Sequence, residues 1–263
     1  MHQTQAALGS SLLAVDGVSV RFGGIVALDG VSFDIAPGQI AGLIGPNGAG
    51  KTTLFNCLSR LYAFQSGQIV FDGRPLLSIP RHGIAAAGIG RTFQNLALFR
   101  TMTVMNNVML GLHCRTRSGF LSNALRLPRV AREERASAVK ARELVEFLSL
   151  ASVAEKRVSD LPFGTQKRVE LARALASEPK LLLLDEPASG LNHEEVHALG
   201  KLIRDIRDRL RVTVLLVEHH MSLVMNVSDK VVALNFGRKI AEGTPAEVQQ
   251  HPEVVQAYLG TTV

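Results

Sequence analysis

The chain has 263 residues, a net charge of +6 and a pI of about 9.7, with 46% hydrophobic and 20% charged residues. This length and composition suit one large α/β domain with a small appended lobe. No apolar run approaches the ~20 residues that a membrane-spanning helix needs. Residues 1–5 lack the basic start and apolar core of a signal peptide, so we expect none. Cys57 and Cys114 form no metal or redox pattern, which is typical of a reducing cytosol.

Residues 12–38 contain short apolar runs broken by Gly and Pro, which predict an antiparallel flap. Ile40–Ile44 then predicts a buried strand, and residues 53–58 have helical character. The loop between them fits the phosphate-loop pattern G-x-x-x-x-G-K-[ST]. Its residues are Gly45, Pro46, Asn47, Gly48, Ala49, Gly50, Lys51 and Thr52. The strand–loop–helix context separates this match from a glycine-rich turn beside a lysine.

The residue types of this loop suit a nucleotide. Glycines let the backbone approach a ligand closely, and the amides from Asn47 to Thr53 point inward at a helix start, where an anion is favoured. Lys51 can reach the terminal phosphates, and the Thr52 hydroxyl can bind Mg²⁺. The loop therefore predicts ATP and Mg²⁺ as ligands.

Further along the chain, residues 68–71 predict a strand that enters a turn. Residues from 93 to about 161 are mostly helical in period, clearest at 102–112 and 136–150, with a loop or short helix at 118–128. This stretch predicts a separate lobe. The α/β pattern returns from Gly164 to about 233, and residues 246–259 predict two short helices divided before Pro252.

Positive charge is concentrated between Arg115 and Arg135, including Arg117, Arg126, Arg129 and Arg132. Such a stretch suits nucleic acid, an anionic membrane surface or plain solvent. Aromatic residues are only 5% of the chain and are not interleaved with the basic stretch, whereas single-strand binding surfaces need stacking platforms. We therefore expect no nucleic-acid partner.

Two apolar strands end in ionisable residues. Leu181–Leu184 leads into Asp185, suited to hold Mg²⁺, and Glu186, suited to polarise an attacking water. A solvated acidic turn is the alternative. The strand at 212–217 is followed by His219, which can sense a γ-phosphate or be an ordinary surface histidine. Gln94 can reach Mg²⁺ and the water, although alone it indicates nothing.

The chain resembles an ATP-binding-cassette (ABC) ATPase over nearly its whole length. The resemblance lies in six segments that occur in the family's order: the phosphate loop (Walker A), Gln94 (Q-loop), residues 161–167 (signature), the Asp185-Glu186 strand (Walker B), residues 189–192 (D-loop) and His219 (switch histidine). The chain also resembles one narrower group, the larger ATPase subunit of branched-chain amino-acid importers (LivG type). This narrower resemblance lies in residues 21–24, 91–94 with 98–99, 217–219, 242–245 and 257–260.

The resemblance implies an α/β P-loop NTPase fold with a RecA-like core, an antiparallel β subdomain and a helical subdomain. One domain would span 12–260, with the core at about 12–92 and 164–260 and the helical lobe at about 93–163. Glu186, His219 and Gln94 would be catalytic, and Thr52, Gln94 and Asp185 would bind the metal. Phe22 would stack on adenine, although a core phenylalanine is a serious alternative.

The resemblance also implies partners. The signature residues Pro162, Phe163, Gly164, Thr165 and Gln166 would contact the γ-phosphate of a nucleotide on a second ATPase subunit, expected to be a different chain. Two membrane permease subunits and, indirectly, a periplasmic substrate-binding protein would complete an importer at the cytoplasmic face of the bacterial inner membrane. ATP hydrolysis would then drive uptake of branched-chain or other hydrophobic amino acids.

Some residues depart from the family pattern Leu-Ser-Gly-Gly-Gln. Pro162 and Phe163 stand at the Ser-Gly positions and Thr165 at the Gln position, while Gly164 remains. Asn192 stands where many relatives have Asp, and His220 where the LivG type usually has Asp. The first departure puts in doubt the site that this chain completes for its partner.

Other functions remain open. Import of urea or short amides and export of lipopolysaccharide are alternatives within transport. An ABC ATPase acting on DNA or ribosomes is less consistent with the chain, because such proteins usually carry long coiled coils or two cassettes.

Overall fold

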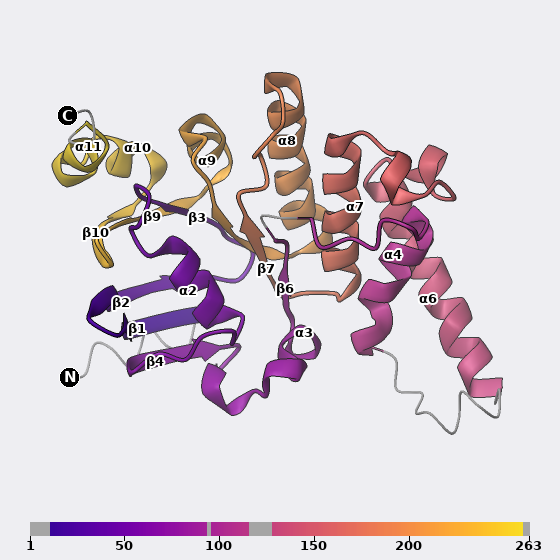
Figure 1. The fold of residues 1–263 in the computed structure, drawn as a ribbon, viewed down its shortest axis with the longest axis horizontal. Helices are drawn as coiled ribbons and strands as arrows, with labels where there is room; N and C mark the ends of the chain where they lie inside the picture. The colour runs from indigo at the N-terminus through magenta and orange to yellow at the C-terminus, as the bar shows by residue number, and fades with distance from the viewer. Residues whose placement is uncertain (1–10, 94–95, 116–127, 260–263) are drawn as a thin grey trace.

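The structure is a computed structural model that describes residues 11–93, 96–115 and 128–259 (Figure 1). A four-stranded sheet has the order β2-β1-β4-β5 and is antiparallel throughout. Its strands are β1 (Leu13–Phe22), β2 (Ile25–Ile35), β4 (Ser66–Phe71) and β5 (Arg74–Pro75). The antiparallel flap predicted at residues 12–38 is confirmed as β1 and β2, and the strand predicted at residues 68–71 pairs with β1.

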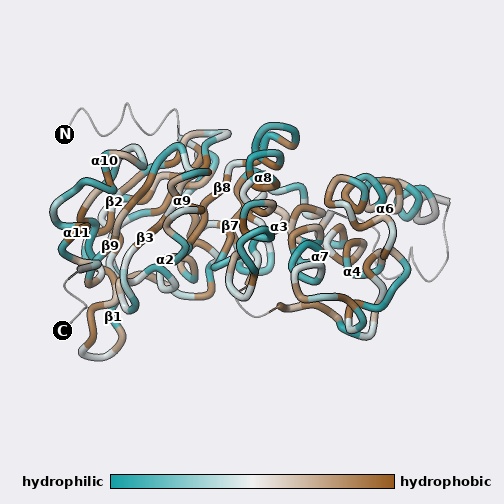
Figure 2. Tube along the Cα trace, turned by 90° about the horizontal axis from the view of Figure 1, so that it is seen from above, coloured by the Kyte–Doolittle hydropathy of each residue, from teal (hydrophilic) through white to brown (hydrophobic). Residues whose placement is uncertain are grey.

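A six-stranded sheet has the order β10-β9-β3-β8-β7-β6, and all its pairs are parallel except β10 with β9. Its strands are β3 (Ile40–Ile44), β6 (Ile89–Arg91), β7 (Leu181–Asp185), β8 (Thr213–Val217), β9 (Lys230–Asn235) and β10 (Arg238–Gly243). Every residue of β3, β7 and β8 is buried, as expected for strands of a sheet covered on both faces. Figure 2 shows these strands as hydrophobic segments.

Two hydrophobic cores lie on opposite faces of the parallel sheet, because alternate strand residues point to opposite sides. Leu181 and Leu183 of β7 pack in the core shared with the antiparallel sheet and with α2 (Lys51–Leu58). Leu182 and Leu184 pack in the other core. That second core also includes buried residues of α8 (His193–Leu210) and α9 (Met221–Val227).

Three helices form the part of the molecule at the right of Figure 1: α4 (Val104–Gly111), α6 (Pro128–Phe147) and α7 (Phe163–Ala176). The helices predicted at residues 102–112 and 136–150 are confirmed, but α6 begins at Pro128. The sequence at the start of α6, residues 128–135, is mostly charged or small and has no apolar stripe, so periodicity gave no signal there. The loop or short helix predicted at 118–128 lies almost entirely outside the described residues.

The shorter elements complete the chain. They are α3 (Ile84–Ala87), α10 (Pro245–Gln249), α11 (Pro252–Leu259) and 3₁₀ turns at 76–78, 81–83, 112–115, 151–153 and 158–160. The tail prediction of two short helices with a break before Pro252 is confirmed. Within the described ranges, no helix has the length and apolarity to cross a bilayer.

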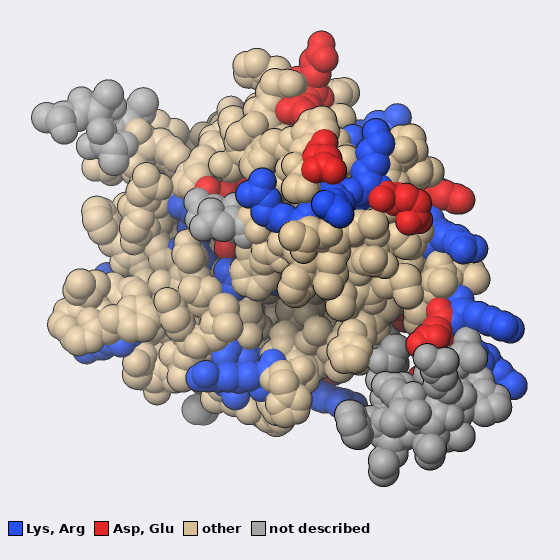
Figure 3. Space-filling model, turned by 45° about the vertical axis from the view of Figure 1, so that its right-hand side comes forward, with Lys and Arg blue, Asp and Glu red and all other residues tan. Residues whose placement is uncertain are grey.

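Charged side chains are interspersed over the helical part. On the face in Figure 3, Lys and Arg lie among Asp and Glu rather than in one basic patch. Much of the basic stretch predicted at 115–135 lies outside the described side chains, although Arg132 and Arg135 are described on α6.

Candidate nucleotide site

The loop at residues 45–50 joins β3 to α2 and needs its glycines. Gly45 has φ 151° and Gly50 has φ 102°, and both lie against neighbouring main chain. A Cβ on Gly45 would lie 2.2 Å from the Leu234 carbonyl oxygen, and one on Gly50 would lie 2.6 Å from that of Ala27. Any side chain there would displace backbone, so the loop is fixed between strands β9 and β2.

Lys51, the first residue of α2, is buried and folds back over the loop. Its Nζ donates to the carbonyl oxygens of Gly45, at 2.6 Å, and Pro46, at 3.0 Å. Burial lowers the Lys51 pKa, while the nearby carboxylates of Glu186 and Asp185 act in the opposite direction. The ammonium therefore lies within electrostatic reach of both acids that follow β7.

Thr52 and Thr53 follow in the first turn of α2, where Thr52 is exposed and Thr53 is half-buried. The first turn contains no acidic side chain, so its amides keep their affinity for an anion. Asn47, Gly48 and Ala49 form the centre of the loop, in which the Ala49 amide donates to the Pro46 carbonyl at 3.2 Å. The predicted phosphate-binding residues thus form one continuous loop and helix start.

Asp185 ends β7 and forms a buried ion pair that the sequence analysis missed. Its Oδ2 accepts from Arg91 Nη2 at 2.9 Å. Arg91 also donates to Asn56 Oδ1 and Ser59 Oγ on and after α2, each at 2.9 Å, and its guanidinium lies over the Phe93 ring. Arg91 therefore links β6, the end of α2 and the acid of β7. The sequence signal that could have revealed Arg91 is a charged residue at the end of a short apolar strand.

Glu186 and His219 meet because their strands pair. Asp185 lies opposite Val217 in the β7–β8 register, so the residues that follow each strand are neighbours. The Glu186 amide donates to the Val217 carbonyl at 2.9 Å, and its Oε1 lies 2.9 Å from His219 Nε2. Glu186 has φ 49°, the left-handed region that a non-glycine residue rarely adopts. The two predicted catalytic side chains are thus in direct contact.

Glu218 joins the turns that follow β7 and β8, and the sequence analysis gave it no role. It is buried, and Oε1 accepts from the Ala188 amide at 2.5 Å. Oε2 accepts from the amides of His219, at 3.0 Å, and His220, at 3.3 Å. A carboxylate bound by several backbone N–H groups fixes the position of His219 relative to Glu186.

Phe22 is not a core residue, because 46% of its surface is exposed at the end of β1. Its ring meets that of Tyr62 edge to face, with centroids 5.2 Å apart and an interplanar angle of 73°. The pair offers an exposed aromatic surface at the end of β1. Tyr62 was missed by sequence reasoning.

The segment with the altered signature begins helix α7. Pro162 is the N-cap residue, and its carbonyl accepts from the amides of Thr165 and Gln166 at 3.0 Å. Gln166 Nε2 donates to the Leu161 carbonyl at 2.8 Å. Phe163 is 47% exposed, while a Cβ on Gly164 would lie 2.5 Å from Glu195 Oε1, so the Glu195 side chain would have to shift to admit one.

Phe163 packs against the D-loop of its own chain. A Cβ on Gly190 would lie 2.9 Å from the Phe163 ring. Asn192 is the N-cap of α8 in a capping box: its Oδ1 accepts from the Glu195 amide, and Glu195 Oε2 accepts from the Asn192 amide, both at 3.0 Å. Asn and Asp cap helices about equally well, so this departure keeps the local structure. His220 likewise caps α9 through its backbone carbonyl.

Gln94 lies outside the described residues, but its surroundings are held by α7. Glu170, buried on that helix, accepts from the Phe93 amide at 3.1 Å and from the Ala97 amide. Burial raises the Glu170 pKa, and these hydrogen bonds act in the opposite direction. Arg173 of the same helix donates to the Ala97 carbonyl at 2.5 Å.

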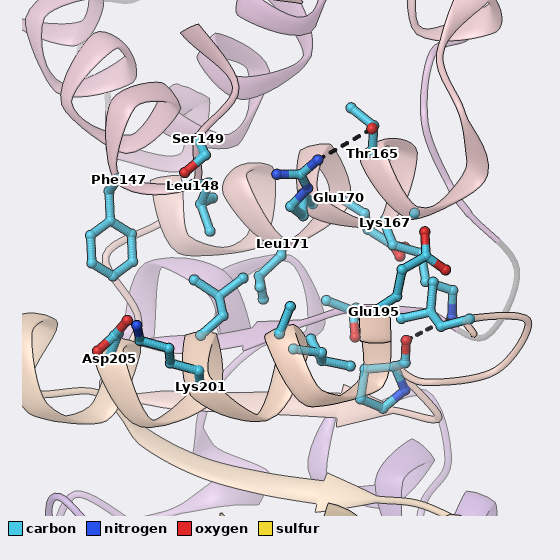
Figure 4. Close-up of a pocket in the computed structure, with 18 of the residues that line it drawn as sticks. Phe147, Leu148, Ser149, Thr165, Lys167, Glu170, Leu171, Glu195, Lys201 and Asp205 are labelled. Carbon is cyan, nitrogen blue, oxygen red and sulfur yellow. Dashed lines mark hydrogen bonds between the residues drawn. The ribbon is translucent and has the colours of Figure 1, made fainter. Parts of the chain in front are cut away.

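A cavity of about 470 Å³ separates α7 from α8 beside this site (Figure 4). Its walls come from the end of α6, one face of α7, one face of α8 and the ends of β6 and β7. Lys167 and Glu170 line the cavity from α7, Lys201 lines it from α8, and Pro187 lines it after β7.

A glycine-rich loop between a parallel strand and a helix, with acids at the end of a nearby strand, defines a P-loop nucleoside triphosphatase. The sequence profile of the ABC transporter family matches residues 28–189, and the profile described as branched-chain amino acid ATP-binding cassette transporter matches residues 238–263. The chain belongs to the ABC transporter family, as one of its ATP-binding, ATP-hydrolysing proteins.

Known proteins resemble it over nearly their whole length. The high-affinity branched-chain amino acid transport ATP-binding protein BraF of Pseudomonas aeruginosa is 42% identical over 95% of this chain and 98% of its own. LivG of Salmonella typhimurium, described in the same words, is 42% identical over 96% and 99%. A solved ATP-binding cassette of an ABC transporter in its ADP conformation superposes with a TM-score of 0.81 at 30% identity, covering 95% of this chain and 99% of that one.

Proposed function

We propose that this chain is the ATP-hydrolysing motor of an importer for branched-chain and other hydrophobic amino acids. The observation that carries the proposal is the match of residues 238–263 to the profile of branched-chain amino acid cassettes. BraF and LivG, which resemble the chain over nearly its whole length, are branched-chain amino acid transport proteins, and this supports the same cargo.

In this proposal ATP lies across the loop at residues 45–50. Lys51 exchanges its bonds to the Gly45 and Pro46 carbonyls for the terminal phosphates, because a charge-assisted pair is stronger than bonds to neutral carbonyls. The amides from Asn47 to Thr53 surround the phosphates, and Phe22 stacks on adenine with Tyr62 supporting its edge.

We infer Mg²⁺ as the second ligand from the chemistry of the proposed donors. The Thr52 hydroxyl is exposed in the first turn of α2, and the Asp185 carboxylate ends β7 within electrostatic reach of the neighbouring Lys51. Hydroxyl and carboxylate oxygens are hard ligands of the kind Mg²⁺ prefers. Thr52 and Asp185, with Gln94, would hold the ion. When bound, it neutralises charge on the phosphates.

Hydrolysis is assigned to Glu186 and His219. Glu186 accepts a proton from the water that attacks the γ-phosphate, while Gln94 helps to orient that water. The Nε2–Oε1 contact keeps His219 at the carboxylate, and the Glu218 carboxylate fixes the histidine backbone. His219 then bonds the γ-phosphate and signals its presence.

Each motor consists of two ATPase subunits, and we infer that the second is a different chain. Residues Pro162–Gln166 of this chain would meet the nucleotide held by the partner's phosphate loop.

Within this chain, the core would comprise residues 12–92 and 164–260 and the helical lobe residues 93–163, with α7 joining the two. Two permease subunits, served by a periplasmic substrate-binding protein, place the motor at the cytoplasmic face of the bacterial inner membrane, without a nucleic-acid partner.

Purification of the native complex tests the proposal. Its membrane subunits should reconstitute ATP-dependent uptake of leucine, isoleucine and valine into vesicles, with the binding protein supplied. Uptake confined to urea or short amides would show that these compounds, and not hydrophobic amino acids, are the cargo. Co-purification with lipopolysaccharide-export subunits or with ribosomes would overturn the importer assignment.

A further inference from the structure

Helix α7 does more than present the signature residues at its first turn. Lys167, one turn into the helix, extends across the cavity wall toward the loop that follows β7 (Figure 4). Its Nζ donates to the Pro187 carbonyl at 3.0 Å and to the Glu186 carbonyl at 3.3 Å. A side chain of the helical part therefore binds the main chain of the residue assigned as general base.

The main chain that Lys167 binds is strained. Glu186 has φ 49°, which for a residue with a side chain persists only where the surroundings hold it. One restraint comes from the sheet, where the Glu186 amide donates to Val217 at 2.9 Å. The ammonium supplies a second restraint on the carbonyl side. A shift of this backbone would move the carboxylate that meets His219.

Phe163 completes the arrangement from the signature side. Its ring lies over the Lys167 ammonium, with Nζ 5.4 Å from the ring centroid, and it also packs on Gly190. A cation beside an aromatic face and partly removed from water is held in place more firmly than one in solvent. The altered signature residue Phe163 thus contacts the side chain that holds Glu186.

We propose that Lys167 is a positioning residue for hydrolysis, which holds the backbone of Glu186 in its left-handed conformation and connects the signature helix to this chain's own general base. The inference rests on the proposed role of Glu186. It deepens that role by naming the group through which the helical part acts on the site.

The test compares Lys167→Met with Lys167→Arg in the assembled transporter. Methionine keeps the length and apolar stem of lysine but cannot donate, so kcat for ATP should fall about ten- to hundredfold, as expected for misplacing a catalytic group. The Kd for ATP should stay within about twofold of the wild-type value, because the phosphate loop is untouched. Arginine, which keeps a cationic donor, should recover most of the rate.

Lys201→Met is the matched control. Lys201 is an exposed lysine that lines the same cavity from α8, and its loss should leave kcat unchanged. Equal losses from Lys201→Met and Lys167→Met would assign the effect to cavity charge and overturn the inference. If Lys167→Met does not yield folded complex, Lys167→Leu, which is apolar and likewise cannot donate, carries the same expectations.

A double mutant separates this inference from the function on which it rests. In a Glu186→Gln background, Lys167→Met should lower the residual rate no further, because both changes act on one group. A further loss of the same size in that background would overturn the inference alone. A wild-type rate in Glu186→Gln itself would instead overturn the assignment of Glu186, whatever Lys167 does.

Discussion

His219 Nε2 lies 2.9 Å from Glu186 Oε1, so the two ionisable residues that follow β7 and β8 touch each other directly. They stand 33 positions apart in the chain and meet because Asp185 pairs with Val217 in the parallel sheet. The contact places a polariser of water beside a residue suited to bind a γ-phosphate.

Lys51→Ala should abolish tight binding of ATP with Mg²⁺, because the cation that faces the terminal phosphates is lost. Calorimetric titration of the variant with nucleotide measures the change. Thr53→Ala, in the same turn, is a suitable comparison, since it removes a hydroxyl and leaves the ammonium. Equal ATP affinity in wild type and Lys51→Ala would disprove the phosphate-loop assignment.

Glu186→Gln should leave ATP bound but stop turnover, because an amide cannot accept a proton from water. The variant should accumulate as a closed pair of ATPase subunits around two nucleotides, detectable by cross-linking. The His219 contact can be kept, since an amide oxygen still accepts a hydrogen bond. Hydrolysis at the wild-type rate would show that another group is the base.

The two nucleotide sites of a heterodimeric motor should differ, because Pro162 and Phe163 remove the signature serine from one of them. A hydroxyl bond to a charged group contributes about 1.5–3 kcal/mol, so its loss weakens transition-state binding about ten- to hundredfold. Amides near Gly164 recover part of this. Transport should therefore suffer more from Glu186→Gln here than from the matching change in the partner.

Reconstituted vesicles that carry one variant subunit at a time provide this measurement. Equal losses from the two variants would contradict the asymmetry. Cross-linking in the membrane complex tests the premise, because a motor built from two copies of this chain would have two identical sites.

Cys57, buried in α2, should resist alkylation in the folded protein well above neutral pH. Burial raises the pKa of its thiol to about 11, and only the thiolate reacts quickly. Half-buried Cys114 should react first with iodoacetamide, as read by mass spectrometry of the two peptides. Modification of Cys57 at pH 8 as fast as in urea would contradict the prediction.

The raised pKa of Cys57 also implies that the free energy of unfolding falls as the pH rises into the alkaline range. The folded thiol holds its proton to a higher pH than the unfolded one, so its contribution to stability is fully present below the unfolded pKa. That contribution is lost as the pH rises through the folded pKa of about 11. The free energy of unfolding should fall less steeply with rising alkaline pH in Cys57→Ala than in wild type.

The sequence located the parts of the site that are contiguous in the chain. The loop from Gly45 to Thr52 is recognisable because its glycines, lysine and threonine are local requirements of one turn and one helix start. The strand endings at Asp185 and Val217 were predicted for the same reason, since a short apolar run followed by polar residues marks a buried strand. The start of α6 was not, because the sequence there has no periodic apolar stripe.

Only the tertiary structure decided which of these side chains meet. Arg91 pairs with Asp185, and Lys167 reaches the carbonyls of Glu186 and Pro187, across separations that no local pattern encodes. Strand order and register set these contacts, and both depend on how the cores pack rather than on any single segment. Sequence by itself determined the chemistry available to this protein, whereas packing determined which residues hold that chemistry in place.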